Sequence, residues 1–167
     1  ADQERFTAAI GFVFEGSPHF VARAWPLRPF ASIEQLYAVL CAGVQGAPEA
    51  EQLALIRAHP DLAGKAAIGG DLTDHSRREQ SSAALDRLSH EQFAAFTRLN
   101  TAYRERFGFP FIICVRDHTR ESILSSFETR LANGAEEERL TALAEVCKIA
   151  RLRLFDAVRE YTEEGSA

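Results

Sequence analysis

Apolar residues recur at intervals of three and four through most of the chain, and residues that start or stop helices separate these runs. This spacing places the apolar side chains on one face of a helix, so it predicts a protein built mainly of helices. Ser32 and Gln35 form a candidate capping box at the start of one helix, which we expect to end at Gly43 or Gly46.

The middle of the chain predicts two more helices with a glycine-containing loop between them. The first begins near Pro48 and ends near His59, because Pro60 disfavours helical geometry in the residue before it. After the loop, at residues 63–74, Ser76 is a candidate cap for a helix that runs to about Leu88.

The next predicted helix carries an aromatic stripe with one polar member. Ser89 and Gln92 form a second candidate capping box, and Gly108 would end the helix. Asn100 lies within the stripe, whose aromatic members recur at intervals of three and four: Phe93, Phe96, Tyr103 and Phe107.

The carboxyl-terminal part predicts an extended crossing followed by two helices. Residues 109–115 are rich in Phe, Ile and Val, which favour an extended and buried segment. A helix over residues 119–131, stopped by Asn133 and Gly134, and another over residues 135–161 complete an all-α, single-domain helical bundle.

Composition limits the class of protein further. The chain has 167 residues, 46% of them hydrophobic, which suits one domain over residues 1–167. Its 24 acidic and 19 basic residues give a charge of -5, which opposes nucleic-acid binding. No apolar run approaches the roughly 20 residues that span a bilayer. The EGSA end differs from a peroxisomal SKL address. We therefore expect a cytoplasmic protein without membrane or nucleic-acid partners.

The three cysteines are far apart in the sequence and form no CxxC pair. Cys41, Cys114 and Cys147 suggest neither a disulfide framework nor a thiolate metal site. We expect buried free thiols in a reducing compartment.

His59 extends the apolar face of the helix before Pro60, because it lies three and four residues after Ile56 and Leu55. A core histidine at a helix end explains this position. A histidine in a pocket explains it too, and such a ring transfers protons near pH 7. Position alone favours the structural interpretation.

Ser76, Glu79 and Gln80 share one helical face. They are candidate ligand-binding residues, but SRRE is also a capping box, which accounts equally well for Ser76 and Glu79. His75 and Glu79 are spaced like metal ligands, yet two such ligands are too few and no zinc motif supplies the rest. We therefore expect no metal.

Arg151 interrupts the apolar face of the last helix, among Cys147, Leu154 and Phe155. A guanidinium there needs a partner, which is either a buried glutamate or a bound ligand, unless its stem reaches the surface. Arg153 points elsewhere, and we expect it to be solvated.

Four blocks of the sequence together resemble one known family. HPDLAGK at residues 59–65, SRREQ at residues 76–80, LNTAYRERFGFPFII at residues 99–113 and the late Arg151 are similar to the 2-oxo-4-hydroxy-4-carboxy-5-ureidoimidazoline (OHCU) decarboxylases of urate catabolism. AWPLRPF at residues 24–30 extends the resemblance. That family usually has glycine where this chain has Ala84.

The resemblance implies an all-α homodimer with no metal or organic cofactor. It implies that His59 and Glu79 are the catalytic acid and base pair. It also implies a set of substrate-binding residues, with backbone amides around Phe111 and Ile112: Pro60, Ser76, Gln80, Phe111, Ile112 and Arg151.

The chemistry of the expected substrate agrees with the absence of a cofactor. Its carboxylate is on a ring carbon next to a C=N bond, which receives the electrons as carbon dioxide leaves and (S)-allantoin forms. Two other functions stay open. One is a non-catalytic helical module that binds a partner through FGFPFII, and the other is a related lyase or hydrolase acting on another ureide.

Overall fold

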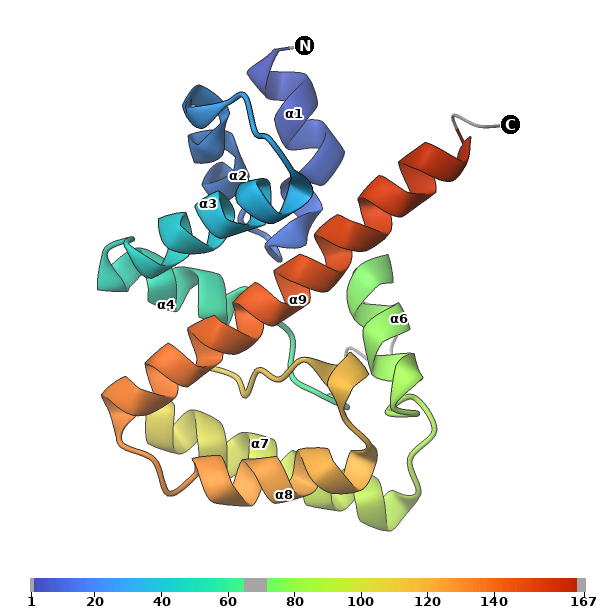
Figure 1. The fold of residues 1–167 in the computed structure, drawn as a ribbon. Helices are drawn as coiled ribbons and strands as arrows, with labels where there is room; N and C mark the ends of the chain where they lie inside the picture. The colour runs from blue at the N-terminus through green and yellow to red at the C-terminus, as the bar shows by residue number, and fades with distance from the viewer. Residues whose placement is uncertain (1, 65–71, 165–167) are drawn as a thin grey trace. The chain divides into compact units, whose positions relative to one another are not determined.

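The regular elements of this computed structural model are helices (Figure 1). The structure describes residues 2–64 and 72–164, and within these ranges it contains no β-strand. The predicted all-α fold is therefore confirmed. Most of the predicted loop at residues 63–74 lies outside the described residues.

The chain divides into two compact units. The first unit comprises Ala1–Ala58 and Val146–Ala167, and the second unit comprises His59–Glu145. The division falls within α9 (Ala135–Glu164), which contributes to both units. A single domain over residues 1–167 stays a prediction.

The first unit contains the amino-terminal helices and the later part of α9. These helices are α1 (Gln3–Ile10), η1 (Gly11–Val13), α2 (His19–Ala24), η2 (Trp25–Leu27), α3 (Ile33–Gln45) and α4 (Glu49–Arg57). Ser32 caps α3 by accepting a hydrogen bond from the N–H of Gln35, as predicted. The Gln35 side chain accepts instead from the N–H of Ala31, so the reciprocal half of the box is absent here.

Arg151 and Arg153 of the last helix have the opposite burial to that predicted. Arg153 is buried, and its Nη1 donates to Oε2 of Glu15 at 2.8 Å and to the carbonyl of Phe12 at 3.1 Å. Arg151 is exposed, with its guanidinium 4.4 Å from the centre of the Phe155 ring. Residues two apart on a helix lie on nearly opposite faces, so only one of them can face the core. The carboxylate of Glu15, from the other end of the chain, pairs with Arg153.

The second unit is built around two long helices and the segment that joins them. It contains α6 (Asp74–Ser82), α7 (His90–Phe107), η3 (Val115–Asp117), α8 (Arg120–Arg130) and the first part of α9. Figure 1 shows α7 and α8 side by side, and residues 109–114, the crossing segment, return along them. The crossing segment is extended and buried, as predicted.

Local signals place the ends of α7 as predicted. Ser89 and Gln92 form a complete capping box, and Gly108 ends the helix with φ 74, a conformation that glycine adopts without strain. Tyr103, on the aromatic stripe, meets the Phe111 ring edge to face at 5.2 Å. Phe111 in turn stacks on Phe127 of α8 at 3.7 Å, so aromatic contacts hold the crossing segment between the helices.

The prediction for α6 is wrong at both ends. Thr73 caps the helix by accepting from the N–H of Ser76, and the helix ends at Ser82 instead of near Leu88. Thr73 lies three residues earlier than Ser76, so Ser76 falls inside the first turn. Beyond the helix, Ala84 has φ 54, a left-handed conformation that favours glycine.

Candidate active site

The loop that carries His59 is fixed by hydrogen bonds from two helices. His59 is 7% exposed and begins residues 59–64, the His59 loop. Oε1 of Gln80 accepts from the N–H of Ala63 at 3.0 Å, and its Nε2 donates to the carbonyl of Asp61 at 3.4 Å. Nδ2 of Asn100 donates to the carbonyl of Leu62 at 2.8 Å. Hydrogen bonds from Gln80 of α6 and from Asn100 of α7 therefore hold the loop.

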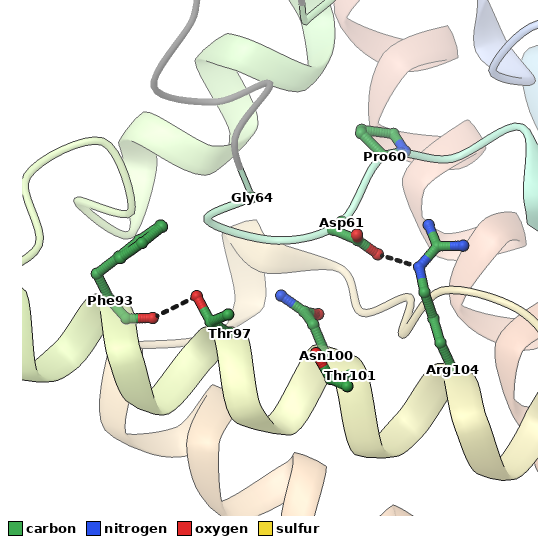
Figure 2. Close-up of a pocket in the computed structure, with 8 residues that line it drawn as sticks. All are labelled: Pro60, Asp61, Gly64, Phe93, Thr97, Asn100, Thr101 and Arg104. Atoms are coloured by element: carbon green, nitrogen blue, oxygen red, sulfur yellow. Dashed lines mark hydrogen bonds and ion pairs between the residues drawn. The ribbon is translucent and has the colours of Figure 1, made fainter.

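Arg104 adds an ion pair to the same loop. Its Nε lies 2.9 Å from Oδ1 of Asp61. Figure 2 shows Asn100 and Arg104 on α7, below the loop that carries Pro60 and Asp61. Asn100 is the polar member of the predicted aromatic stripe, a pattern that indicates no role for it, and no local pattern indicates the role of Arg104.

A pocket of about 410 Å³ borders the His59 loop. Of the predicted site residues, Pro60 contributes to its wall. The lining is a mixture of loop and α7 side chains: Pro60, Asp61, Gly64, Phe93, Thr97, Asn100, Thr101 and Arg104 (Figure 2). The space is large enough for a small molecule. Asn100 and Arg104, two of its polar lining residues, are the α7 side chains that contact the His59 loop.

Three predicted site residues lie on α6. Ser76 and Gln80 are each 4% exposed, and Glu79 is partly buried. Because Thr73 caps this helix, the capping-box explanation of Ser76 and Glu79 no longer applies. Their placement on one buried face, beside the amide that holds the His59 loop, agrees with a role in a site.

α6 packs against η3, which follows the crossing segment. Burial, together with the carboxylates of Asp117, Glu145 and Glu79, raises the pKa of the Cys114 thiol to about 12. The contact between α6 and η3 brings the helix that carries Glu79 near the end of the crossing segment. Within the second unit, the structure thus brings Glu79 close to the segment that carries Phe111 and Ile112.

The crossing segment has both anchored and unpaired backbone groups. The carbonyl of Ile112 accepts from Nη1 of Arg130 at 2.6 Å, and the N–H of Cys114 donates to Oε2 of Glu145 at 2.7 Å. Between these anchors, the N–H groups of Phe111, Ile112 and Ile113 have no hydrogen-bond acceptor among the described residues. All three residues are buried. A buried N–H without an acceptor costs about 1–3 kcal/mol, so these groups favour a site where a ligand supplies one.

A buried network behind the crossing segment was not predicted. Glu138 is 0% exposed, and it accepts from Nε of Arg130 at 2.7 Å, Oη of Tyr103 at 2.5 Å and Nδ2 of Asn133 at 2.9 Å. Burial and the hydrogen bond to Glu138 raise the pKa of Tyr103. No local sequence pattern indicates this network, because its members come from three helices and a turn.

Arg151 belongs to the first unit, whereas the other predicted site residues belong to the second. Within the first unit its charge acts on Glu34 and on Tyr37. Burial and the contact with the Cys41 thiol raise the pKa of Tyr37. The predicted buried carboxylate partner of Arg151 is not found among the described residues.

All three cysteines are free and buried, as predicted. In residues 2–64 and 72–164, no three His, Cys, Asp or Glu side chains gather as a metal site. None of the helices that the structure describes is long and apolar enough to cross a membrane.

Comparison with known proteins gives consistent results. Residues 1–155 match the family described as OHCU decarboxylase. The chain is 43% identical to the 2-oxo-4-hydroxy-4-carboxy-5-ureidoimidazoline decarboxylase of Halalkalicoccus jeotgali, over 100% of this chain and 94% of that protein. It is 37% identical to a uric acid degradation bifunctional protein of Bacillus subtilis, over 97% of this chain and 32% of that protein.

The fold is also similar to that of a solved structure. The crystal structure of an (S)-allantoin synthase superposes with a TM-score of 0.73 at 28% identity. The match covers 94% of this chain, which spans about half of that structure's chain, 51%.

Proposed function

Because this chain belongs to the OHCU decarboxylase family, a family of decarboxylating lyases, we propose that it converts 2-oxo-4-hydroxy-4-carboxy-5-ureidoimidazoline into (S)-allantoin during urate degradation. The substrate carries its own electron sink, so the reaction proceeds without a metal or an organic cofactor. The protein has to orient the carboxylate, stabilise the developing charge and deliver a proton to one face of the ring.

The observation that carries this proposal is the attachment of the His59 loop to α6 through Gln80. Gln80 holds Ala63 and Asp61 of the loop, and Glu79 is the residue before it on the helix. Catalytic groups that are fixed by their supporting residues meet the substrate in a productive geometry. His59 and Glu79 then act as the acid and base pair, one accepting the hydroxyl proton while the other, or a bound water, reprotonates the ring.

Substrate contacts come from α6 and from the crossing segment. The unpaired N–H groups around Phe111 and Ile112 are donors in a dry site, where they stabilise developing negative charge far better than water does. Ser76 and Pro60 complete this side of the site. An amide group has two donor hydrogens and an oxygen with two lone pairs, so Gln80 can contact the substrate while it holds the loop.

Arg151 supplies the anion contact in this proposal. Among the described residues its guanidinium has a ring contact with Phe155 and no hydrogen-bonded carboxylate, so its five donors are available to the substrate carboxylate.

We also propose a cytoplasmic homodimer, as the family resemblance implies. Light scattering coupled to size-exclusion chromatography measures the mass of the assembly directly.

The test uses freshly generated substrate and enzyme treated with a chelator. The protein should accelerate formation of dextrorotatory (S)-allantoin, followed by circular dichroism, whereas spontaneous decay yields a racemate. His59→Asn protein, purified in the same way, is the matched control. A racemic product formed at the uncatalysed rate would exclude this function, and turnover of another ureide in a substrate screen would redirect it.

A further inference from the structure

Arg130 contacts the crossing segment in two ways. Its Nη1 donates to the carbonyl of Ile112 at 2.6 Å, and its guanidinium lies 4.3 Å from the centre of the Phe111 ring. Only 10% of its side chain is exposed. Both residues that it contacts belong to the crossing segment, whose backbone N–H groups are assigned to substrate binding in the proposed function.

The contact with Ile112 determines the direction of a neighbouring amide. The carbonyl of Ile112 and the N–H of Ile113 belong to the same planar peptide, and in a trans peptide they point in opposite directions. A donor that holds this carbonyl therefore aims the Ile113 N–H away from Arg130. The next peptide is held independently, because the N–H of Cys114 donates to Glu145 at 2.7 Å.

We propose that Arg130 is a positioning residue that aims the N–H of Ile113 at the substrate. This inference rests on the proposed function, in which backbone donors of the crossing segment stabilise the developing charge. Arg130 itself does not touch the substrate. It acts through the peptide between Ile112 and Ile113, whose N–H has no acceptor among the described residues.

Glu138 holds the guanidinium in place. Its fully buried carboxylate accepts from Nε of Arg130 at 2.7 Å, which leaves Nη1 to reach the Ile112 carbonyl. The planar guanidinium of Arg130 contacts Glu138 and the Ile112 carbonyl at once, because its nitrogens are spread over a rigid fork. The ammonium of lysine is a single point of charge and lacks this fork. Arg130→Lys therefore keeps the charge beside Glu138 but loses the simultaneous hold on Ile112.

The same network offers a matched control. Tyr103 donates to the carboxylate of Glu138 and makes no hydrogen bond to the crossing segment among the described residues. Tyr103→Phe removes one hydrogen bond from the network, keeps the aromatic ring and leaves the contact between Arg130 and Ile112. A residue with a merely structural role should behave like Tyr103.

The experiment measures kcat, KM, melting temperature and the backbone amide shift of Ile113 on saturation with (S)-allantoin. Losing one donor to developing charge typically costs about 10²–10³-fold in kcat, and misdirecting it costs less. We expect Arg130→Lys to lower kcat by roughly 10- to 100-fold and to reduce the Ile113 shift. Tyr103→Phe should lower the melting temperature at least as much, with kcat within about twofold of the parent enzyme and the shift retained.

Three results would overturn the inference. One is an Arg130→Lys enzyme with the parent kcat and the parent Ile113 shift. Another is a loss of kcat in both variants that follows the melting temperature. If Arg130→Lys does not fold, the double variant Arg130→Gln with Glu138→Gln, which removes both buried charges, is measured instead. The third result that would overturn the inference is a kcat of this double variant equal to that of the parent enzyme. A parent enzyme without turnover would instead overturn the proposed function itself.

Discussion

Arg153 and Glu15 form a buried ion pair that joins the two ends of the chain within the first unit. Nη1 of Arg153 lies 2.8 Å from Oε2 of Glu15, and the two side chains are 3% and 7% exposed. The same nitrogen donates to the carbonyl of Phe12 at 3.1 Å. The guanidinium thus connects α9 to the segment that follows α1.

Removal of Arg153 should be costly. Arg153→Ala leaves the Glu15 carboxylate buried beside an empty space, and we expect the free energy of unfolding to fall by about 3–5 kcal/mol. Arg151→Ala, at an exposed position two residues earlier, should change it by less than about 0.5 kcal/mol. Urea denaturation measures both. Equal effects at the two positions would contradict the burial of the ion pair.

His59→Asn should retain the fold and lose turnover. General acid or base assistance contributes about 10²–10⁴-fold to rate, so kcat should fall within that range while the melting temperature stays near that of the parent protein. Steady-state kinetics and a thermal melt of the same preparation give both values. A loss of less than tenfold with an unchanged melt would make His59 a structural residue at the end of α4.

Arg151→Lys should weaken ligand binding and leave stability intact. Lysine keeps the charge but loses the planar pair of donors that matches a carboxylate or a carbonyl. Titration calorimetry with (S)-allantoin should show an affinity at least about fivefold lower, which corresponds to roughly 1 kcal/mol. Arg159→Lys, at another exposed position of α9, is the control and should bind as the parent does. Equal affinities in all three proteins would remove Arg151 from the proposed site.

Ala84→Gly should stabilise the protein. Ala84 has φ 54, and a non-glycine residue there costs about 1–2 kcal/mol. Glycine also adds freedom to the unfolded chain, which offsets about 0.4–1 kcal/mol of the gain. We expect a net increase of about 0.5–1 kcal/mol in the free energy of unfolding. Ala83→Gly, at φ -102, is the matched control and should destabilise the protein. Destabilisation by both changes would show that Ala84 is unstrained.

Cys114 should make stability depend on pH in the alkaline range. Burial, with a contribution from nearby carboxylates, raises the pKa of its thiol from 9.0 to about 12 in the folded protein. Between these values the unfolded chain has lost the proton and the folded chain has kept it, so stability decreases as pH rises. One proton corresponds to a slope of about 1.4 kcal/mol per pH unit.

The check compares the parent protein with Cys114→Ala by urea denaturation at pH 8 and pH 10.5. The stability difference between the two proteins should move in favour of Cys114→Ala as pH rises, because the variant lacks this ionisation. A difference that does not change with pH would show that the thiol titrates alike in both states.

The sequence by itself determined the elements whose signals are local. The capping box of Ser89 and Gln92 and the left-handed Gly108 set the two ends of α7, because a cap involves only residues within one turn. The aromatic and β-branched composition of residues 109–115 predicted the extended crossing for a similar reason. The family resemblance, which rests on the order of short blocks, supplied His59, Glu79 and the other candidate site residues.

Only the tertiary structure decided which residues of similar local pattern are buried and paired. Ser76 and Thr73 are both residue types that cap helices, and in the structure Thr73 caps α6 while Ser76 lies in its first turn. Arg151 and Arg153 are both arginines among apolar neighbours of α9, but it is Arg153 that pairs with Glu15, which lies 138 positions away in the chain. Arg130 and Glu138 gain their roles from Ile112 and Tyr103, which lie 18 and 35 positions away from them, respectively. Local sequence patterns do not predict contacts between residues so far apart in the chain. The fold that brings such partners together depends on many weak interactions and not on any one local pattern.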